Sequence, residues 1–317
     1  MEHDWQLVSR RRCRRRQCPS LHLSSKAISR AVNDEEVGAT LAEVSPAKQL
    51  QIIQRVRAIA DDNLRESVLL KDALRSIGKQ FHSTTAPTSL GKDAEDQEVK
   101  DERLVVVGYG LGSFCASANA VHQLGFLVAL MDALNNECRR TTSAEDCANS
   151  GEVQPTAEIF DPAMNKSDAS IAEQLGLSVI RENEHGRRRV VCNTVFFMPH
   201  CAKVLYENVL ACNWGPAVKQ LVIIGNSFSA YGDRVLAGDG RRQLLLEKVL
   251  PYLEEVHLSC GVTKQHENFA CYEAAFNDLS VHRFPPELLG SALASDLDLI
   301  ARMAAVASSA ESKELDA

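Results

Sequence analysis

A glycine-rich segment directly after an apolar run is the first feature of the chain that could carry chemistry. Residues 108–113 (GYGLGS) follow residues 104–107 (LVVV), a run typical of a strand buried on both faces. Such a turn lets the backbone approach a phosphate or a ribose, and the next helix N-terminus attracts negative charge. Ser113 stands where a dinucleotide fingerprint has glycine or alanine. Val106 stands where the S-adenosylmethionine loop usually has an acid. A nucleotide-like ligand and a tight turn that needs positive φ both stay open.

A second candidate is Asp161, at the end of the short strand expected at 157–160. In Rossmann-like sheets an acidic residue at this position accepts hydrogen bonds from ribose hydroxyls. Asp161 lies 49 residues after Gly112, against the usual spacing of about 20. A polar insertion, 135–156, which we expect to be a flexible loop, accounts for most of the excess. The alternative is that Asp161 and Pro162 simply begin a turn.

A third group of candidates follows the later expected strands, at residues 198–201 (MPHC), 225–228 (GNSF) and 277–282. Open α/β sheets bind ligands at the carboxyl ends of their strands. His200 and Cys201 suggest a base and a nucleophile, but adjacent residues point in different directions. We therefore expect His200 and His282 to orient loops through hydrogen bonds. No G-x-S-x-G elbow and no H-E-x-x-H motif occurs, so we predict neither a hydrolase triad nor a metal site.

The residues expected to line a pocket share one edge of the predicted sheet. They are Gly108, Gly110, Gly112, Ser113, Asp161, His200, Asn226 and Ser227. Catalytic residues are not assigned, and the cofactor stays unknown, with S-adenosylmethionine and NAD(P) both open.

Strands that alternate with helices must position these residues. Strands are expected at 104–107, 157–160, 177–180, 194–197, 220–224, 253–258 and 275–284, and helices at 113–134, 169–175, 201–212, 241–250 and 287–306. This alternation predicts a Rossmann-like, doubly wound, mostly parallel α/β sheet of about seven strands. Only a loop, 259–272, separates the last two strands, so an antiparallel edge is possible, as in class I methyltransferases. That similarity concerns the fold and does not establish chemistry.

A helical segment, 45–81, precedes this sheet. Ser45 can cap a helix, and Pro46 suits its first turn. Apolar residues then recur at helical spacing, in one long amphipathic helix or in two helices broken near residues 61–63. The apolar stripe needs a partner, which is either the body of the protein or another chain. The expected organisation is a disordered basic head (1–44), the helical segment (45–81), a linker (82–102), the sheet domain (103–286), and a C-terminal helix with a tail (287–317).

Charge is unevenly distributed along the 317 residues. The formal net charge is −7, and six arginines lie between Arg10 and Arg16, which leaves −13 for the remainder. The basic run fits an address read by a nuclear import receptor or a weak contact with nucleic acid, and the alternative is a solvated, disordered tail. The acidic remainder gives no strong nucleic-acid signal, because a general binder needs a basic face. The longest apolar stretch, 124–131, is too short to cross a bilayer, and the ten cysteines form no C-x-x-C pair. We therefore expect a soluble intracellular protein with free thiols.

Seven motifs in order resemble those of one family. They are 108–114 (GYGLGSF), 160–162 (FDP), 183–186 (NEHG), 198–201 (MPHC), 206–210 (YENVL) with 213–214 (NW), 222–228 (VIIGNSF), and 276–278 (FND) through 282–285 (HRFP). The set, over residues 103–286, resembles the sensitivity-to-red-light-reduced family, the SRR-like domain proteins of plants, fungi and animals.

This resemblance implies a regulatory role in biological rhythms, through the circadian clock, and in the control of haem biosynthesis. It also implies residence in the cytoplasm and the nucleus. The resemblance supplies no settled enzyme activity and no agreed catalytic residues. Unknown protein partners could bind through the 45–81 helix, and an import receptor through Arg10–Arg16. The alternative to a regulator is an enzyme: an S-adenosylmethionine-dependent, methyltransferase-like transferase, or an NAD(P)-linked enzyme.

Overall fold

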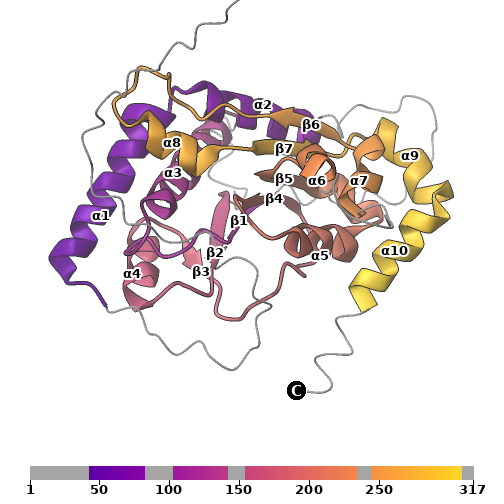
Figure 1. Cartoon of the computed structure of the whole chain (residues 1–317), viewed down its shortest axis with the longest axis horizontal. Coiled ribbons are helices and arrows are strands. Elements are labelled where there is room, and N and C mark those ends of the chain that lie inside the picture. Colours follow the sequence, from indigo (N-terminus) through magenta and orange to yellow (C-terminus); the bar gives the residue numbers. More distant parts are fainter. Residues whose placement is uncertain (1–42, 83–102, 142–153, 235–244, 309–317) are drawn as a thin grey trace, which may run out of the picture. The chain divides into compact units, whose positions relative to one another are not determined.

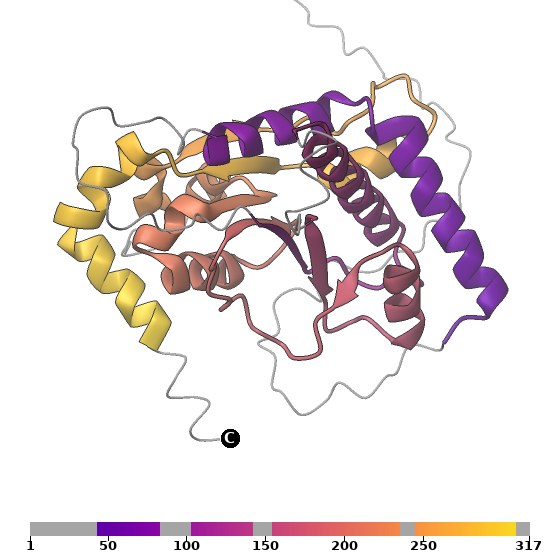
Figure 2. The ribbon, with the colours of Figure 1, turned by 180° about the vertical axis from the view of Figure 1, so that it is seen from behind.

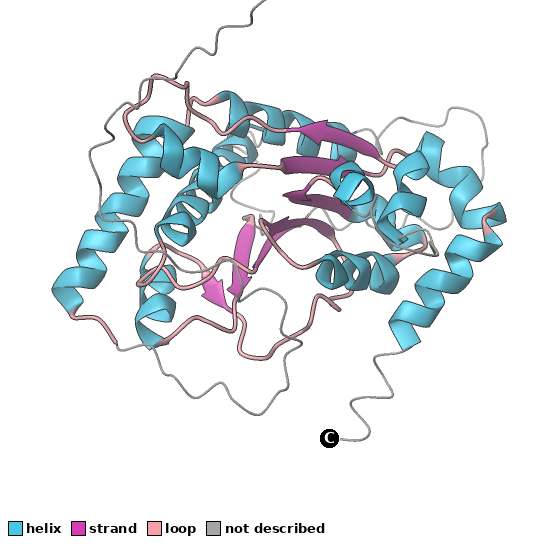
Figure 3. Ribbon diagram, in the orientation of Figure 1, coloured by secondary structure: helices cyan, strands magenta, loops and turns pink. Residues whose placement is uncertain are grey.

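The computed structural model describes residues 43–82, 103–141, 154–234 and 245–308. The expected basic head, linker and C-terminal tail lie largely outside these residues. The described chain is a mixed α/β structure with helices on both faces of one seven-stranded sheet (Figure 3).

The sheet has the strand order β3-β2-β1-β4-β5-β7-β6. Its strands are β1 (Leu104–Tyr109), β2 (Thr156–Phe160), β3 (Ser178–Val179), β4 (Asn193–Met198), β5 (Leu221–Asn226), β6 (Glu254–His257) and β7 (Leu279–Arg283). Neighbours among the first five are parallel, whereas β7 runs antiparallel to both β5 and β6. The expected mostly parallel sheet with an antiparallel edge is confirmed.

Ten α-helices connect and cover these strands in the described part of the chain. They are α1 (Pro46–Ala58), α2 (Val68–His82), α3 (Ala118–Thr141), α4 (Lys166–Gln174), α5 (Lys203–Asn213), α6 (Phe228–Arg234), α7 (Leu245–Val249), α8 (Phe269–Phe276), α9 (Pro286–Ser295) and α10 (Leu297–Ser308).

Two hydrophobic cores lie on opposite faces of the sheet, because side chains alternate along each strand. Val106 of β1 points into the core beneath α1, α2, α3 and α8, and Val107 into the core beneath α5, α7 and α10. Figures 1 and 2 show these two helical layers from opposite sides. The central strands are buried on both faces, which explains their continuous apolar sequence.

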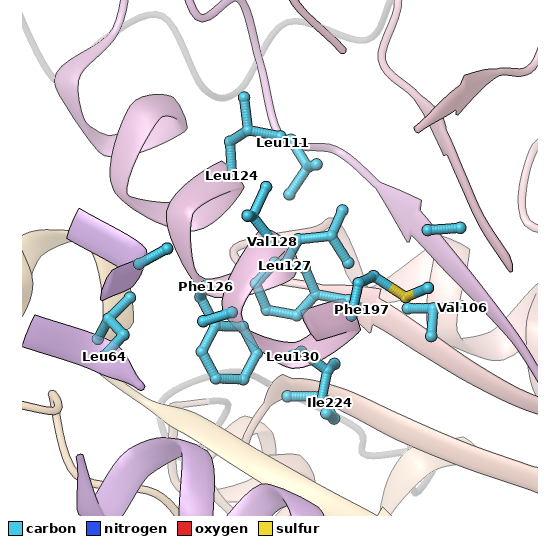
Figure 4. Packing of buried hydrophobic residues seen from close by; sticks show 14 of the residues in the cluster. Leu64, Val106, Leu111, Leu124, Phe126, Leu127, Val128, Leu130, Phe197 and Ile224 are labelled. Atoms are coloured by element: carbon cyan, nitrogen blue, oxygen red, sulfur yellow. The ribbon is translucent and has the colours of Figure 1, made fainter. Parts of the chain in front are cut away.

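The N-terminal helices belong to the first of these cores. Ser45 caps α1 by accepting a hydrogen bond from the Lys48 amide at 3.3 Å, as expected. The segment is two helices and not one long helix, because a π-helical turn, Ile59–Leu64, separates α1 from α2. Gly125 of α3 allows this turn to approach, since a Cβ there would lie 2.6 Å from Ile59 Cγ2. Leu64 packs beside the buried face of α3 (Figure 4), so the apolar stripe is covered by the body of the protein.

One buried side chain, Gln80, fixes the end of α2 to the sheet. Its Nε2 donates to the carbonyls of Lys219 (2.8 Å) and Phe284 (3.1 Å), and its Oε1 accepts from the Phe284 amide at 2.7 Å. These contacts span 139 and 204 residues of sequence, so local sequence patterns could not predict them.

Several expected boundaries are wrong. The third helix begins at Ala118, not Ser113, and continues to Thr141, so the start of the expected insertion loop is helical; residues 142–153 lie outside the described chain. Helix α8 occupies residues that were expected to be the end of a loop and the start of a strand, and α6 lies in a segment for which no element was predicted. The last expected helix is two helices that meet at Asp296. No helix within the described ranges is long and apolar enough to cross a membrane.

Candidate functional site at the carboxyl edge of the sheet

The glycine loop after β1 adopts the backbone that its sequence suggested. Gly110 and Gly112 have φ of +73° and +77°, in the region that favours glycine. The Gly110 amide donates to the Phe160 carbonyl at 3.1 Å, which ties the loop to the end of β2. A Cβ on Gly110 would lie 2.5 Å from Cys201 Sγ. The group that lies close to Gly110 is therefore the Cys201 thiol of the protein itself.

Asp161 lies beside this loop, and its carboxylate holds the loop in place. Oδ2 accepts a hydrogen bond from the Gly112 amide at 2.8 Å, and Oδ1 accepts from the Ala163 amide at 2.7 Å. The sequence correctly associated Asp161 with the glycine loop across 49 residues. In the structure its partners are two backbone amides, and the turn predicted by the alternative interpretation is also present.

Two other predicted pocket residues of this segment are packed inside the protein. Gly108 lies within β1, where a Cβ would be 3.1 Å from Ile159 Cγ2. Ser113 is buried, and its carbonyl accepts from the amides of Ala116 (3.3 Å) and Ser117 (3.0 Å). Its hydroxyl has no hydrogen-bond partner among the described residues.

Asn226, at the end of β5, organises the loop after β4. Its Oδ1 accepts from the His200 amide at 2.7 Å, and this stabilises His200 at φ +56°, which is unusual for a non-glycine residue. Its Nδ2 donates to the Tyr231 hydroxyl at 3.1 Å and lies 3.4 Å from the Cys201 carbonyl. The side chain of Asn226 is therefore occupied by this loop and by Tyr231.

Tyr206 of α5 links the ends of two strands and was not among the predicted pocket residues. Its buried hydroxyl accepts from the Asn226 amide at 2.9 Å and donates to the Met198 carbonyl. Gly225 permits this position, because a Cβ there would lie 2.7 Å from the Tyr206 hydroxyl. The family motifs contain both residues, so the resemblance held a signal that composition and spacing did not.

His200 and Cys201 do not form a base–nucleophile pair, as expected. The exposed His200 ring contacts the Ala275 carbonyl through Nε2 at 3.1 Å, whereas the buried Cys201 thiol donates to the Tyr109 carbonyl at 3.3 Å. Burial, followed by the negative charge of Asp161, raises the pKa of the Cys201 thiol to about 12. At neutral pH Cys201 is a protonated thiol and a poor nucleophile.

Ser227 begins a second cluster at the same edge. Its amide donates to the Asp278 carbonyl at 2.9 Å, and its hydroxyl accepts from the Ala230 amide at 3.1 Å. Glu255 of β6 accepts from the Ser229 amide (3.1 Å) and hydroxyl (3.2 Å). Ser227 and Glu255 together satisfy amides in the first turn of α6.

His282 lies within the sheet, with Glu255 on one side. It is fully buried, stacks on Phe228 with ring centroids 3.8 Å apart, and donates from Nδ1 to the Ile223 carbonyl at 3.2 Å. Its Nε2 lies 3.9 Å from Glu255 and has no hydrogen-bond partner in the described chain. Burial lowers the pKa of His282 to about 4, although the charge of Glu255 opposes this shift. The ring is neutral at pH 7.

The NEHG motif belongs to a half-buried ionic network around Tyr109, the last residue of β1. Tyr109 donates its hydroxyl to Glu184, and Arg188 forms a bidentate pair with Glu184 (2.9 and 3.0 Å) and contacts Glu158 at 2.7 Å. Burial, followed by the Glu184 hydrogen bond, raises the pKa of the Tyr109 hydroxyl, so it stays protonated. The sequence did not identify Arg188 or Glu158 as partners.

Two asparagines of α5 hold the same loop. Asn208 donates to the His185 carbonyl at 2.8 Å, and Asn213 accepts from the Val190 amide at 2.8 Å and donates to the Arg188 carbonyl at 2.9 Å. The motifs YENVL and NW are thus explained by hydrogen bonds between α5 and the loop 185–190.

The structure therefore brings Gly110, Gly112, Asp161 and Cys201 together, and it joins His200 to Asn226. Ser227 lies in the separate cluster around Glu255. Within the described ranges, no three His, Cys, Asp or Glu side chains are arranged to hold a metal ion.

Comparison with known proteins gives the family of this chain. The SRR1 domain model matches residues 71–283, more than half of the chain. The chain belongs to the SRR1 domain family. The expected resemblance is confirmed, and the matched region begins inside α2.

Three relatives of this SRR1 domain protein come from distant organisms. It is 34% identical to the mouse SRR1-like protein over 152 residues, which is 47% of this chain and 52% of the relative. It is 26% identical to the Arabidopsis thaliana protein Sensitivity to Red Light Reduced 1 over 225 residues, 68% of this chain and 74% of the relative. Identity to the Drosophila melanogaster SRR1-like protein is 25% over 189 residues, 59% of this chain and 57% of the relative.

The SRR1 domain chain thus spans about half the length of its mouse relative and about three quarters of the plant one. No solved structure is significantly similar to it.

Proposed function

We propose that this SRR1 domain protein is a regulator, not an enzyme, and that it acts in circadian clock control and in the control of haem biosynthesis. Membership of the family supports a regulatory role, and the plant relative is named for sensitivity to red light. The clock and haem roles, with residence in nucleus and cytoplasm, are those that the family resemblance implies.

One observation carries this proposal: the potentially reactive side chains at the carboxyl ends of the strands are engaged in contacts within the protein itself. Asp161 accepts from two amides, Asn226 supports the His200 loop, and Cys201 is a buried, protonated thiol. General acid–base or nucleophilic catalysis needs a group with a suitable pKa within reach of a substrate. These residues instead stabilise the loops that surround them.

A nucleotide-like ligand at this edge is the second candidate. The first five strands have the order 3-2-1-4-5, as in doubly wound nucleotide-binding sheets, and the glycine loop begins the crossover to α3. The two oxygens of a carboxylate accept about four hydrogen bonds, so Asp161 could receive a ribose hydroxyl as well. A ligand that needs the Gly112 amide must displace Asp161. An S-adenosylmethionine-dependent transferase or an NAD(P)-linked enzyme is the activity that such a ligand would imply.

The regulatory proposal is tested in cells of the source organism from which the gene is deleted. We expect deletion to change the period or amplitude of a clock-driven luciferase reporter and the steady-state level of haem. Wild-type protein should restore both. The Asp161→Asn variant, expressed at the wild-type level, separates the regulator from the nucleotide-binding candidate. A regulator that binds no ligand through this carboxylate should still restore both the rhythm and the haem level. Unchanged rhythm and haem levels after deletion would contradict the proposal.

A further inference from the structure

A hollow between α1 and the segment before α3 is distinct from the carboxyl-edge site. It has a volume of about 330 Å³. Four residues of α1 line one side of it: Lys48, Gln51, Ile52 and Arg55. Their spacing of three, four and seven residues places them on one face of the helix. Residues 114–118 and Val121 line the other side.

Two cations face this hollow without a carboxylate partner. Within the described residues, neither Lys48 nor Arg55 forms an ion pair or a side-chain hydrogen bond. Several other cations of the same helical segment are paired: Arg57 with Asp132 at 3.3 Å, Arg65 with Asp61 at 2.5 Å and Lys71 with Glu66 at 2.9 Å. Three cations of this segment have no partner among the described residues, Lys48, Arg55 and Lys79, and the first two of them line the hollow.

The remaining lining combines apolar surface with a backbone donor. Ile52, Phe114 and Val121 are buried and give the hollow an apolar floor. Ala118, the first residue of α3, also lines it, and its amide donates to no acceptor in the described chain. The helix dipole adds positive potential at this end of α3. These positively polarised groups favour an anionic ligand over a cationic one.

Acidic groups beside the hollow are already used inside the protein. The fully buried Asp168 accepts from the Cys115 amide at 2.9 Å and from the Asn165 amide at 3.0 Å. Burial, followed by the hydrogen bond to Asp168, raises the pKa of the Cys115 thiol to about 12, so this lining residue carries no negative charge. Neither residue forms an ion pair or a hydrogen bond with Lys48 or Arg55 within the described residues.

We propose that this hollow binds a small organic phosphate. Its phosphate is held by Lys48 and Arg55, and its uncharged part lies against Ile52, Phe114 and Val121. The volume is at the lower end of the roughly 300–1,000 Å³ of small-molecule sites, which suits a nucleoside monophosphate or a sugar phosphate. Arginine and lysine are the usual phosphate ligands of proteins. This inference does not rest on the proposed regulatory role.

Isothermal titration of the full chain with AMP, glucose 6-phosphate, inorganic phosphate and adenosine tests the proposal. We expect at least one organic phosphate to bind more tightly than both inorganic phosphate and adenosine, because it uses the cations and the apolar floor together. The double variant Lys48→Gln/Arg55→Gln should lose at least tenfold in affinity. The matched control is Arg57→Gln, on the same helix but paired with Asp132, which should bind like the wild type.

The two variants change exposed or half-exposed side chains, so their unfolding midpoints should stay close to that of the wild type. Equal affinity of the wild type and the double variant would overturn the proposal. So would the absence of binding by both organic phosphates at millimolar concentration, or an equal loss in Arg57→Gln, which would indicate only a general charge effect.

Discussion

Gly110→Ala tests the contact between the glycine loop and Cys201. An alanine Cβ would lie 2.5 Å from Cys201 Sγ, well inside van der Waals contact, in a residue with φ of +73°. A non-glycine residue in this conformation costs about 1–2 kcal/mol, and overpacking typically adds about 1–3 kcal/mol. We therefore expect Gly110→Ala to reduce the free energy of unfolding by about 2–5 kcal/mol.

Gly112→Ala is the matched control. Gly112 has nearly the same φ, +77°, but its Cβ would meet only Ala120 Cβ at 3.8 Å, an ordinary contact. The control should therefore lose only the conformational part, about 1–2 kcal/mol. Urea denaturation of the single variants, of Cys201→Ala and of Gly110→Ala/Cys201→Ala gives the coupling energy between the two positions. Removing the sulfur should recover about 1–3 kcal/mol of the loss. Equal losses at Gly110 and Gly112, or zero coupling with Cys201, would refute the reasoning. Because Gly110 substitutions destabilise the loop in this way, they cannot report ligand binding on their own.

Three further predictions concern other parts of the molecule. Tyr206→Phe should cost about 1–3 kcal/mol in urea denaturation, because it leaves the Asn226 amide and the Met198 carbonyl without their buried partner. Tyr252→Phe removes a hydroxyl that donates to Asp296 at a half-buried site and should cost less, so equal costs would contradict the assignment. The native pKa of His282, about 4, is below its unfolded value of about 6.5, so the unfolded state binds the proton first as pH falls. The free energy of unfolding should therefore decrease as pH drops from 6.5 towards 4, by up to about 1.4 kcal/mol per pH unit. His282→Phe should remove this slope between about pH 6.5 and 5, and an unchanged slope would assign it to other groups. Replacing the arginines of Arg10–Arg16 with glutamine should move a fluorescently tagged chain out of the nucleus without altering its unfolding midpoint, and an unchanged nuclear fraction would favour the solvated tail.

The sequence predicted the central part of the fold because its signals there are local. Continuous apolar runs marked β1, β4 and β5, and Ser45 with Pro46 marked the start of α1. Helix α8 was missed because its partners are distant: the carbonyls of Ala274 and Ala275 accept from α3 and from the His200 loop. Local patterns carry no information about such contacts.

The sequence predicted which residues lie at the candidate site better than it predicted what those residues do there. Parallel strands end at one edge, so Asp161, His200 and Asn226 could be placed beside the glycine loop before their contacts were known. Their roles follow from hydrogen bonds across 49 and 26 residues, namely Asp161 to the Gly112 amide and Asn226 to the His200 amide. Arg188 and Glu158 gave no motif signal, because an ion pair across 30 residues has no characteristic spacing.

Binding of S-adenosylmethionine and NAD(P) to the full chain tests most directly whether this protein is a regulator rather than a transferase or an oxidoreductase. Each compound is titrated by calorimetry at millimolar concentration into wild type and Asp161→Asn. We predict no binding heat for any of them, because Asp161 already occupies the Gly112 amide. Stoichiometric binding of one compound at micromolar concentration, weakened in an Asp161→Asn variant with an unchanged unfolding midpoint, would contradict this prediction and support a cofactor-dependent enzyme.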